Sequence, residues 1–229
     1  MIDKFKQLAR HIPGAEAFYV WLSRKFFRGS QSYWESRYAS GGNSGAGSYE
    51  RLAEFKAEIL NDFVRDNRVA SVIEFGCGDG NQLAIAQYPE YVGLDVSQNA
   101  IKMCEDRFGG DDTKRFLMYR PFVADDASRG LRADLALSLD VIYHLVENEV
   151  YKKYMTHLFE SARRFVIVYS SNRDDGTTAG HIRHRRFTEW VEENARSWQL
   201  KTKIENRYPF DPRSPDDTSF ADFYVFERQ

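Results

Sequence analysis

The chain has few cysteines and almost no excess of charge of either sign. Cys77 and Cys104 are the only thiols among 229 residues, and they do not form a Cys-x-x-Cys pair. Two isolated thiols predict a reduced, cytoplasmic protein. Asp and Glu total 34 against 32 Lys and Arg, a net charge of −2. This balance disfavours nucleic acid as a partner, because binding a phosphate backbone requires a basic field.

Long apolar runs are also absent. The longest stretch without Asp, Glu, Lys or Arg runs from Tyr38 to Tyr49, and it is rich in Gly and Ser rather than in Leu or Val. The sequence therefore predicts no transmembrane helix. Asp3 and Lys4 follow the first two residues, so no secretory signal is expected either.

Apolar residues recur at helical spacing from Ile2 to Arg28, with Pro13-Gly14 between two short amphipathic segments. This helical arm is rich in Lys and Arg, so it has two interpretations: packing on its own domain, or peripheral contact with a membrane surface. A glycine-rich loop over residues 41–48 follows. We divide the chain into an N-terminal helical arm and lid, residues 1–47, and a domain of residues 48–229.

Beyond the loop, short apolar runs alternate with amphipathic helices, which predicts an α/β protein with a parallel sheet and helical crossovers. Strands are expected at 71–75, 91–95, 116–119, 134–139 and 165–169. Helices are expected at 52–63, 81–87, 98–108, 147–161 and 188–195. Two final runs, 200–208 and 220–226, alternate well enough to close the sheet as an antiparallel hairpin.

One strand runs directly into a glycine-rich turn, Gly76-Cys77-Gly78-Asp79-Gly80. Such a turn lets a ligand approach the backbone closely. Asp95 lies 19 residues beyond Gly76, where it can accept hydrogen bonds from ribose hydroxyls, so the pair predicts an adenosine-type site. The spacing differs from the Gly-x-Gly-x-x-Gly of dinucleotide sites, and Glu74 before the turn suits a cationic ligand.

Here the sequence resembles class I S-adenosylmethionine-dependent methyltransferases, whose first motif is acidic-x-Gly-x-Gly-x-Gly. The resemblance implies S-adenosyl-L-methionine as cofactor. It also implies a Rossmann-like fold, a doubly wound, mostly parallel seven-stranded sheet with the helical arm and the C-terminal antiparallel hairpin. The cofactor-binding residues that it implies are Glu74, Gly76, Cys77, Gly78, Asp95, Val96, Asp125, Asp126 and Leu139. A Rossmann-like domain that binds nothing is the alternative.

Asp125 and Asp126 are the least specific members of this set. The family places an acidic group near the adenine after its third strand, and both residues meet that description. A pair of solvated carboxylates that caps the turn before Ser128 explains them equally well.

Tyr143 and His144 follow the fourth strand and are the catalytic candidates. An imidazole suits a general base for a hydroxyl, and a packed or capping histidine is the alternative. The lid candidates for acceptor binding precede the glycine-rich loop and are Tyr33, Trp34, Arg37 and Tyr38. In a chain that is 15% aromatic, such residues also serve as plain packing.

A basic segment, residues 181–186, supplies the remaining acceptor candidates, His181, Arg183, His184 and Arg185. It predicts an anion cradle, or alternatively a solvated turn that pairs with nearby glutamates. No metal site is expected there, because the flanking cations oppose a metal ion.

A looser resemblance links several segments to bacterial methyltransferases of surface-polysaccharide biosynthesis. It predicts an O-methyltransferase for a polar, anionic, phosphate- or sugar-linked acceptor, as in capsule or lipopolysaccharide synthesis. The alternatives are a small-molecule N-methyltransferase and a non-catalytic adenosine-binding scaffold. A nucleic-acid methyltransferase is disfavoured by the net charge of −2.

Overall fold

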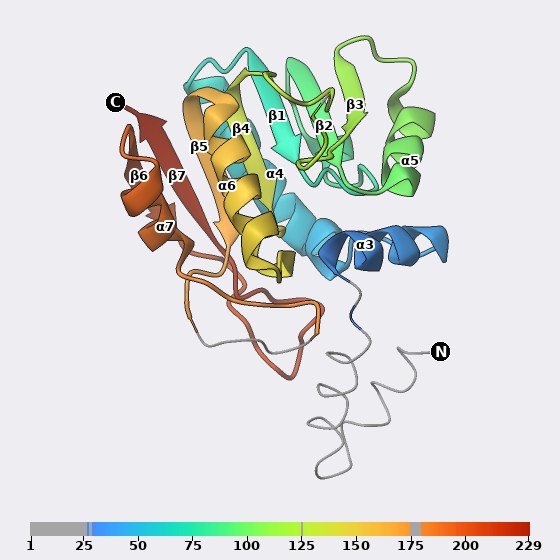
Figure 1. Ribbon diagram of the computed structural model, residues 1–229. Helices are drawn as coiled ribbons and strands as arrows, with labels where there is room; N and C mark the ends of the chain where they lie inside the picture. The colour runs from blue at the N-terminus through green and yellow to red at the C-terminus, as the bar shows by residue number, and fades with distance from the viewer. Residues whose placement is uncertain (1–26, 28, 125, 175–179) are drawn as a thin grey trace.

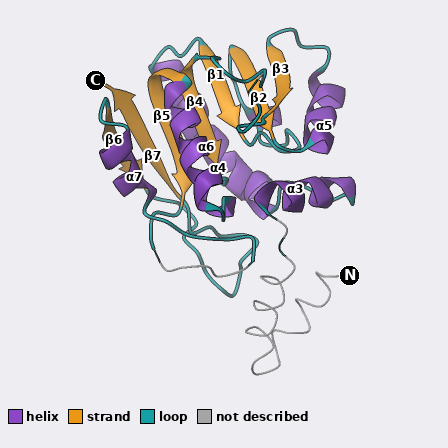
Figure 2. Cartoon of the chain, in the orientation of Figure 1, coloured by secondary structure: helices purple, strands orange, loops and turns teal. Residues whose placement is uncertain are grey.

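One seven-stranded sheet organises the chain in the computed structural model, which describes residues 27, 29–124, 126–174 and 180–229 (Figures 1 and 2). The strands are β1 (Ser71–Phe75), β2 (Glu90–Asp95), β3 (Lys114–Met118), β4 (Ala133–Leu139), β5 (Ala162–Ser170), β6 (Trp198–Ile204) and β7 (Asp222–Arg228). Their order is β3-β2-β1-β4-β5-β7-β6. Strands β1 to β5 are parallel, and β7 runs antiparallel between β5 and β6. The predicted doubly wound fold with a final antiparallel pair is confirmed.

The described helices are α3 (Ser30–Ala39), α4 (Glu50–Asp66), α5 (Gln98–Phe108), α6 (Asn148–Glu160) and α7 (Phe187–Asn194). Three short 3-10 turns lie in the loops: η1 (Ala46–Ser48) between α3 and α4, η2 (Leu83–Ile85) between β1 and β2, and η3 (Ile142–His144) between β4 and α6. Figure 1 shows α3 lying across the ends to which the arrows of β1 and β2 point. The helix therefore crosses the carboxyl ends of the parallel strands, the edge where open α/β sheets bind ligands.

The core has two layers, because successive side chains of a strand point to opposite faces of the sheet. Val72 packs in one cluster with residues of α4 and α5, whereas Ile73 packs in the other with residues of α6 and α7. The stripe predicted for α6 is buried as expected, with Tyr154, Met155 and Leu158 in the second cluster. Both faces of β1 are thus covered, which fixes the direction in which its glycine-rich turn leaves the sheet.

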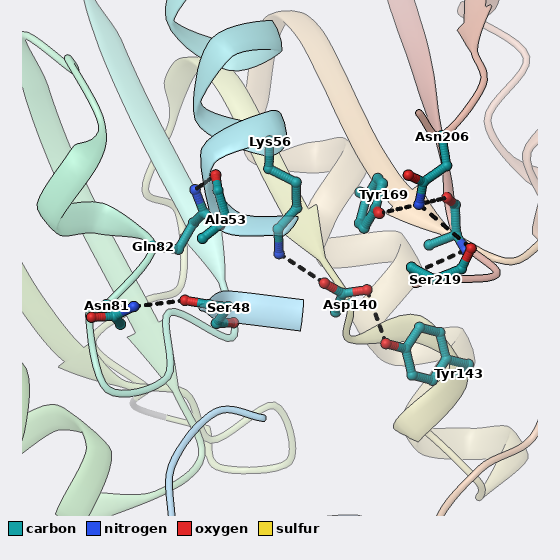
Figure 3. Close-up of polar contacts among 11 residues, drawn as sticks. Ser48, Ala53, Lys56, Asn81, Gln82, Asp140, Tyr143, Tyr169, Asn206 and Ser219 are labelled. Carbon is teal, nitrogen blue, oxygen red and sulfur yellow. Dashed lines mark hydrogen bonds and ion pairs between the residues drawn. The ribbon is translucent and has the colours of Figure 1, made fainter. Parts of the chain in front are cut away.

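The helix predicted over 81–87 is wrong, since only the short turn η2 forms there. Polar side chains at its start bind elsewhere: Asn81 Nδ2 donates to Ser48 O and Gln82 Nε2 donates to Ala53 O (Figure 3). Strand β2 already begins at Glu90, and Pro89 before it disfavours a helical conformation at Tyr88. Few residues are therefore left for a helix between the glycine-rich turn and β2. The segment is instead held against α4 and η1.

The last two strands are shifted from their predicted positions. Strand β6 ends at Ile204 rather than near residue 208, because Asn206 turns inward. Its Nδ2 donates to Tyr169 Oη at 2.7 Å (Figure 3). The same Nδ2 also donates to Ala221 O at 3.0 Å. The predicted arm over residues 2–28 lies outside the described residues, apart from Phe27. Among the described helices, none combines the length and apolarity that a bilayer crossing requires.

Candidate active site

A cavity of about 320 Å³ opens where β1 ends between β2 and β4. The neighbouring connections leave β1 in opposite directions at this point, so a crevice forms at the carboxyl ends of the strands. The walls come from the glycine-rich turn, the ends of β2 and β4, and α3 with the loop after it. Its size falls in the range of small-molecule sites.

Main-chain hydrogen bonds hold the glycine-rich turn against β2. The N–H groups of Gly76 and Cys77 donate to Leu94 O at 2.7 and 3.0 Å, and Gly78 N donates to Asp95 Oδ2 at 3.0 Å. Gly78 has φ of +59°, which L side chains rarely adopt, and a Cβ there would overlap Ser44 Oγ. The turn therefore needs glycine both for its own conformation and for close approach of the following loop.

Two buried carboxyl groups line the cavity beside this turn. Burial raises the pKa of Glu74 to about 7, although Glu74 Oε2 accepts a 2.7 Å hydrogen bond from Tyr91 Oη. Burial likewise raises the pKa of Asp95 to about 6, against the opposing effect of donors such as Ser97 N. A cation bound nearby would favour the ionised form of both groups.

Gln82 adds an unpartnered acceptor to the same wall. Its side chain is buried and lines the cavity, its Nε2 donates to Ala53 O, and its Oε1 has no hydrogen-bond partner among the described residues. Cys77 also lines the cavity as a free thiol, and its hydrogen bond with the Cys104 thiol together with burial raises the pKa of Cys77. Two carboxyl groups, an amide oxygen and a neutral thiol fit a ligand that carries cationic donors.

Asp140 forms a second polar centre at the end of β4. Lys56 Nζ lies 2.8 Å from Asp140 Oδ2, and Tyr143 Oη donates to Asp140 Oδ1 at 2.9 Å (Figure 3). Lys56 is only 1% exposed, and Asp140 has φ of +60° although it is not glycine. Lys56 and Asp140 line the cavity, whereas the predicted catalytic Tyr143 does not. Tyr143 orients Asp140 instead.

His144 lines the cavity from the turn that follows β4. Its Nδ1 lies 3.0 Å from the carbonyl oxygen of His181. A carbonyl oxygen only accepts, so Nδ1 carries the hydrogen and Nε2 carries the lone pair. Burial lowers the pKa of His144 to about 4, so the imidazole is neutral near pH 7. Within the described residues, Nε2 makes no hydrogen bond.

The arrangement has counterparts among known proteins. Residues 48–211 match a family model described as a methyltransferase domain. The chain belongs to this family. Together with the fold, the match confirms the prediction of a class I S-adenosylmethionine-dependent methyltransferase. None of the curated proteins compared with the chain matches it.

Solved structures share the fold of this methyltransferase at low sequence identity. The N-methyltransferase NodS from Bradyrhizobium japonicum WM9, in complex with S-adenosyl-l-homocysteine, is 14% identical over 87% of this chain and 98% of its own, with a TM-score of 0.65. The magnesium protoporphyrin IX methyltransferase ChlM from Synechocystis PCC 6803, with bound SAM, is 16% identical over 91% and 96%, with a TM-score of 0.57. The methyltransferase domain of bacterial CtHen1 is 19% identical over 76% and 96%, with a TM-score of 0.57.

The segment predicted to be a lid corresponds to α3 together with the loop after it. Ser30 N donates to Glu147 Oε1 at 2.9 Å, and Ser30 Oγ lies 2.6 Å from both Glu147 Oε2 and His144 O. At the other end of the lid, Ser44 N donates to Asp79 Oδ2 at 2.9 Å. Between these ends, Asn99 Nδ2 donates to Glu35 Oε1 at 2.6 Å. The lid is thus fixed to α6, to α5 and to the glycine-rich turn.

Two of the four predicted lid residues line the cavity, Trp34 and Tyr38. The Trp34 ring meets the His144 ring edge-on at 4.9 Å. Tyr33 lies outside the cavity lining and stacks on His181 at 4.5 Å, and Arg37 Nε donates to Asn43 O at 2.6 Å. Tyr33 and Arg37 therefore make their contacts outside the cavity lining.

The arginines of the basic segment bond main-chain carbonyl groups, and their predicted anion binding stays a prediction. Arg183 Nη1 donates to Val146 O and to Asn148 Oδ1, and Arg185 donates to Leu145 O and Val146 O. Burial lowers the pKa of Arg185 to about 10. The carbonyl groups before the start of α6 lack helical partners, so the guanidinium groups satisfy them. Neither arginine lines the cavity.

The two histidines of this segment also lie outside the cavity lining. His184 is buried, and its Nδ1 lies 2.7 Å from Ser171 Oγ. The carbonyl oxygen of His181 accepts the hydrogen bond from His144 Nδ1. The two histidines therefore join the basic segment to the residue after β5 and to the turn after β4. Among the described residues no three His, Cys, Asp or Glu side chains cluster as metal ligands would.

Of the predicted cofactor residues, Glu74, Gly76, Cys77, Gly78, Asp95, Val96 and Leu139 line the cavity. Asp126 does not, because its carboxylate accepts from Arg120 N, Ser128 N and Ser128 Oγ. This is the turn-capping arrangement that the sequence left open. Asp125 lies outside the described residues.

Proposed function

We propose that this methyltransferase transfers the methyl group of S-adenosylmethionine to a hydroxyl group of a polar, sugar-linked small molecule. The observation that carries the proposal is the tautomer of His144. Its Nδ1–H is committed to His181 O, so its Nε2 lone pair is left to accept a hydrogen bond from a hydroxyl group in the cavity.

The cofactor half of the cavity suits a sulfonium compound. Asp95 accepts from the ribose hydroxyls, and the turn at Gly76 and Gly78 lets the backbone approach the methionine part. Glu74 and the unpartnered Gln82 Oε1 offer acceptors for a cationic ammonium group. When bound, S-adenosylmethionine supplies an electrophilic methyl group. The chain positions both reactants and excludes water.

His144 orients the acceptor, and its Nε2 takes up the hydroxyl proton as the oxygen–methyl bond forms and the carbon–sulfur bond of the cofactor breaks. Its pKa of about 4 makes it a weak base that stays neutral above about pH 5. Trp34 contacts it from the lid and offers an apolar face beside the acceptor. The lid thereby keeps the reacting oxygen in a dry, aligned position.

Charge in the cavity favours an acceptor that is uncharged at its reacting end. The described lining contains five carboxyl groups, those of Glu74, Asp79, Asp95, Asp140 and Glu147. It contains one lysine, Lys56, which is paired with Asp140. This excess opposes an anion beside the methyl group. The sugar-linked character is supported by the looser sequence resemblance to surface-polysaccharide methyltransferases.

The same carboxyl groups favour a second candidate, N-methylation of an amine. A protonated amine would be attracted to the cavity and would have to lose its proton before reaction. Its rate would then rise tenfold per pH unit up to the pKa of the amine. A hydroxyl acceptor held by neutral His144 predicts a kcat, at saturating cofactor, that is nearly independent of pH between about 6 and 8.

The cofactor part is tested by calorimetric titration of the full chain with S-adenosylmethionine and S-adenosylhomocysteine. Micromolar binding is expected. Asp95→Asn keeps the shape of the side chain but removes its charge, and it is expected to weaken binding by about tenfold or more. A folded protein that binds neither ligand would overturn the proposal in favour of a scaffold.

The acceptor part is tested with a panel of neutral sugars, nucleotide sugars and small amines. His144→Gln retains a hydrogen-bond acceptor, whereas His144→Ala removes it. We expect His144→Ala to lower kcat for the hydroxyl acceptor by about 100-fold and His144→Gln by less, with cofactor affinity unchanged. Turnover with amines alone would replace O-methylation with N-methylation.

A further inference from the structure

A second cavity of about 380 Å³ lies on the α6 face of the sheet. The chain between β3 and β4 crosses this face without forming a helix in its described part. Tyr119 and residues 128–132 line one side of the cavity, and Lys153, His157 and Glu160 of α6 line the other. The proposed function uses none of these residues, although Tyr119 also lines the first cavity.

The charge of the second cavity is opposite to that of the first. Arg129, Arg132 and Lys153 line it, together with a single carboxylate, Glu160. In the part of the chain that the structure describes, none of these three cations forms an ion pair or a side-chain hydrogen bond. By contrast, the cation of the first cavity, Lys56, is paired with Asp140. Unpaired guanidinium and ammonium groups around a hollow are suited to a phosphate, which accepts several hydrogen bonds at once.

His157 connects this charge to the wall between the cavities. Its Nδ1 lies 3.0 Å from Tyr119 Oη. Burial, and then the charge of Lys153, lowers the pKa of His157, with Arg129 acting in the same direction and Glu160 and Asp126 opposing it. A bound anion would reverse the effect of the cations and favour the imidazolium form, which donates from both nitrogens. Tyr119 Oη would then become the acceptor of this bond.

We propose that the second cavity binds the phosphate group of a small phosphorylated molecule, and that its occupancy is coupled to the cofactor cavity through Tyr119. The cavity exceeds what inorganic phosphate alone would fill, so an organic phosphate is the expected ligand. Arg129 and Arg132 hold the phosphate oxygens, and Lys153 and His157 complete the site from α6. Binding of the phosphate stands independently of the proposed function, whereas the coupling rests on it.

Phosphate binding is tested on the full chain by calorimetry with pyrophosphate, glucose 1-phosphate and, as a neutral control, glucose, all at constant ionic strength. Both phosphates are expected to bind and glucose is not. The double variant Arg129→Gln/Arg132→Gln should weaken phosphate binding by about tenfold or more. Arg115→Gln/Arg196→Gln is the matched control, since both arginines are exposed and outside the two cavities.

Either of two results would overturn the site. The first is that neither phosphate binds the unmodified chain. The second is that the control variant loses as much affinity as Arg129→Gln/Arg132→Gln, which would show that binding follows net charge and not the cavity. Circular dichroism of each variant confirms that the fold is retained.

The coupling is tested by measuring S-adenosylhomocysteine affinity with and without glucose 1-phosphate. A change of about fivefold or more is expected in the unmodified chain. Tyr119→Phe removes the hydroxyl that contacts His157, so it should still bind glucose 1-phosphate but lose this response. An affinity that is the same with and without the sugar phosphate would overturn the coupling. Failure of the proposed function would appear separately, as no binding of S-adenosylhomocysteine at all.

Discussion

The two halves of the active-site cavity are built in different ways. At the ends of β1 and β2, main-chain donors fix the shape, and Gly78 N reaches Asp95 across only 17 positions of sequence. At the end of β4, side chains distant in the sequence fix it: Lys56 and Asp140 are 84 positions apart, and Ser30 and Glu147 are 117 apart. The cofactor half is therefore a local unit, whereas the acceptor half exists only in the complete fold.

This difference separates the effects of substitution. A substitution in the local unit should change cofactor affinity, because the main chain of the glycine-rich turn forms that part of the cavity wall. A change among the long-range side chains alters the acceptor half or the stability of the fold and leaves the glycine-rich turn intact. The four predictions below test this separation.

The largest effect is expected from Lys56→Met. The substitution leaves Asp140, whose side chain is 15% exposed and lines the cavity, without its buried cation, which costs about 3 kcal/mol of unfolding free energy. Lys152→Met is the control, because Lys152 pairs with Glu149 on the exposed side of α6 and should cost less than about 0.5 kcal/mol. Urea denaturation measures both. Equal losses in the two variants would remove the special role of the buried pair.

The next effect is expected from Gly78→Ala. The left-handed conformation and the overlap with Ser44 Oγ should weaken S-adenosylhomocysteine binding by about 30-fold. At Gly110 a Cβ would meet no atom within 4 Å, so Gly110→Ala should leave the affinity unchanged. Calorimetry compares the two variants. Normal affinity in Gly78→Ala would show that the turn adapts and that the local unit is not rigid.

Cofactor affinity should depend on pH through the cofactor half alone. Glu74 and Asp95 have pKa values of about 7 and about 6 in the free protein, so both become neutral as the pH falls. Binding of a cation requires the ionised forms, and S-adenosylmethionine affinity should fall about tenfold per pH unit below 7 and more steeply below 6.

Titrations between pH 5 and pH 8 measure this dependence, and Glu74→Gln should flatten it between pH 6 and pH 7. The contribution to folding has the opposite sign. Because both folded pKa values are raised, these groups stabilise the free protein below their ordinary pKa, and this contribution is lost as the pH rises through 6 to 7. A pH-independent affinity would contradict the role of the two carboxyl groups.

The smallest effect is expected from Ser30→Ala at the start of the lid. The substitution removes the hydroxyl contacts with Glu147 and the His144 carbonyl, so S-adenosylhomocysteine should dissociate about fivefold faster and the acceptor KM should rise. Ser40→Ala is the control, because Ser40 is exposed at the other end of α3 and, among the described residues, its hydroxyl donates only to Arg37 O. Stopped-flow dissociation distinguishes them. Identical rates would show that the contact at Ser30 does not hold the lid.

The same contrast explains what the sequence predicts well. The glycine-rich turn, Asp95 and the apolar stripe of α6 are patterns within short segments, and short-range spacing determines which strand, turn or face results. The family and the fold are confirmed, and seven of the nine predicted cofactor residues line the cavity. Their functional roles, and the division of the chain at residue 47, stay predictions.

The acceptor half was less predictable because its contacts join distant segments. Lys56 lies on the apolar stripe of α4, and a lysine at such a position signals a buried partner, but nothing in the sequence names Asp140. Arg183 and Arg185 resemble an anion site in the sequence because the carbonyl groups that they satisfy become visible only when the start of α6 is placed beside them. The missing helix after Gly80 has the same origin, since Asn81 and Gln82 bind η1 and α4.

The attachments of α3 and the loop after it have a consequence for access to the cavity. They bind α6 through Ser30 and the glycine-rich turn through Ser44, so they span both halves of the cavity. Trp34 lies between these attachments and contacts His144 in the cavity lining. Any movement of α3 away from the cavity would therefore break contacts in both halves at once, so access to the two halves should be coupled.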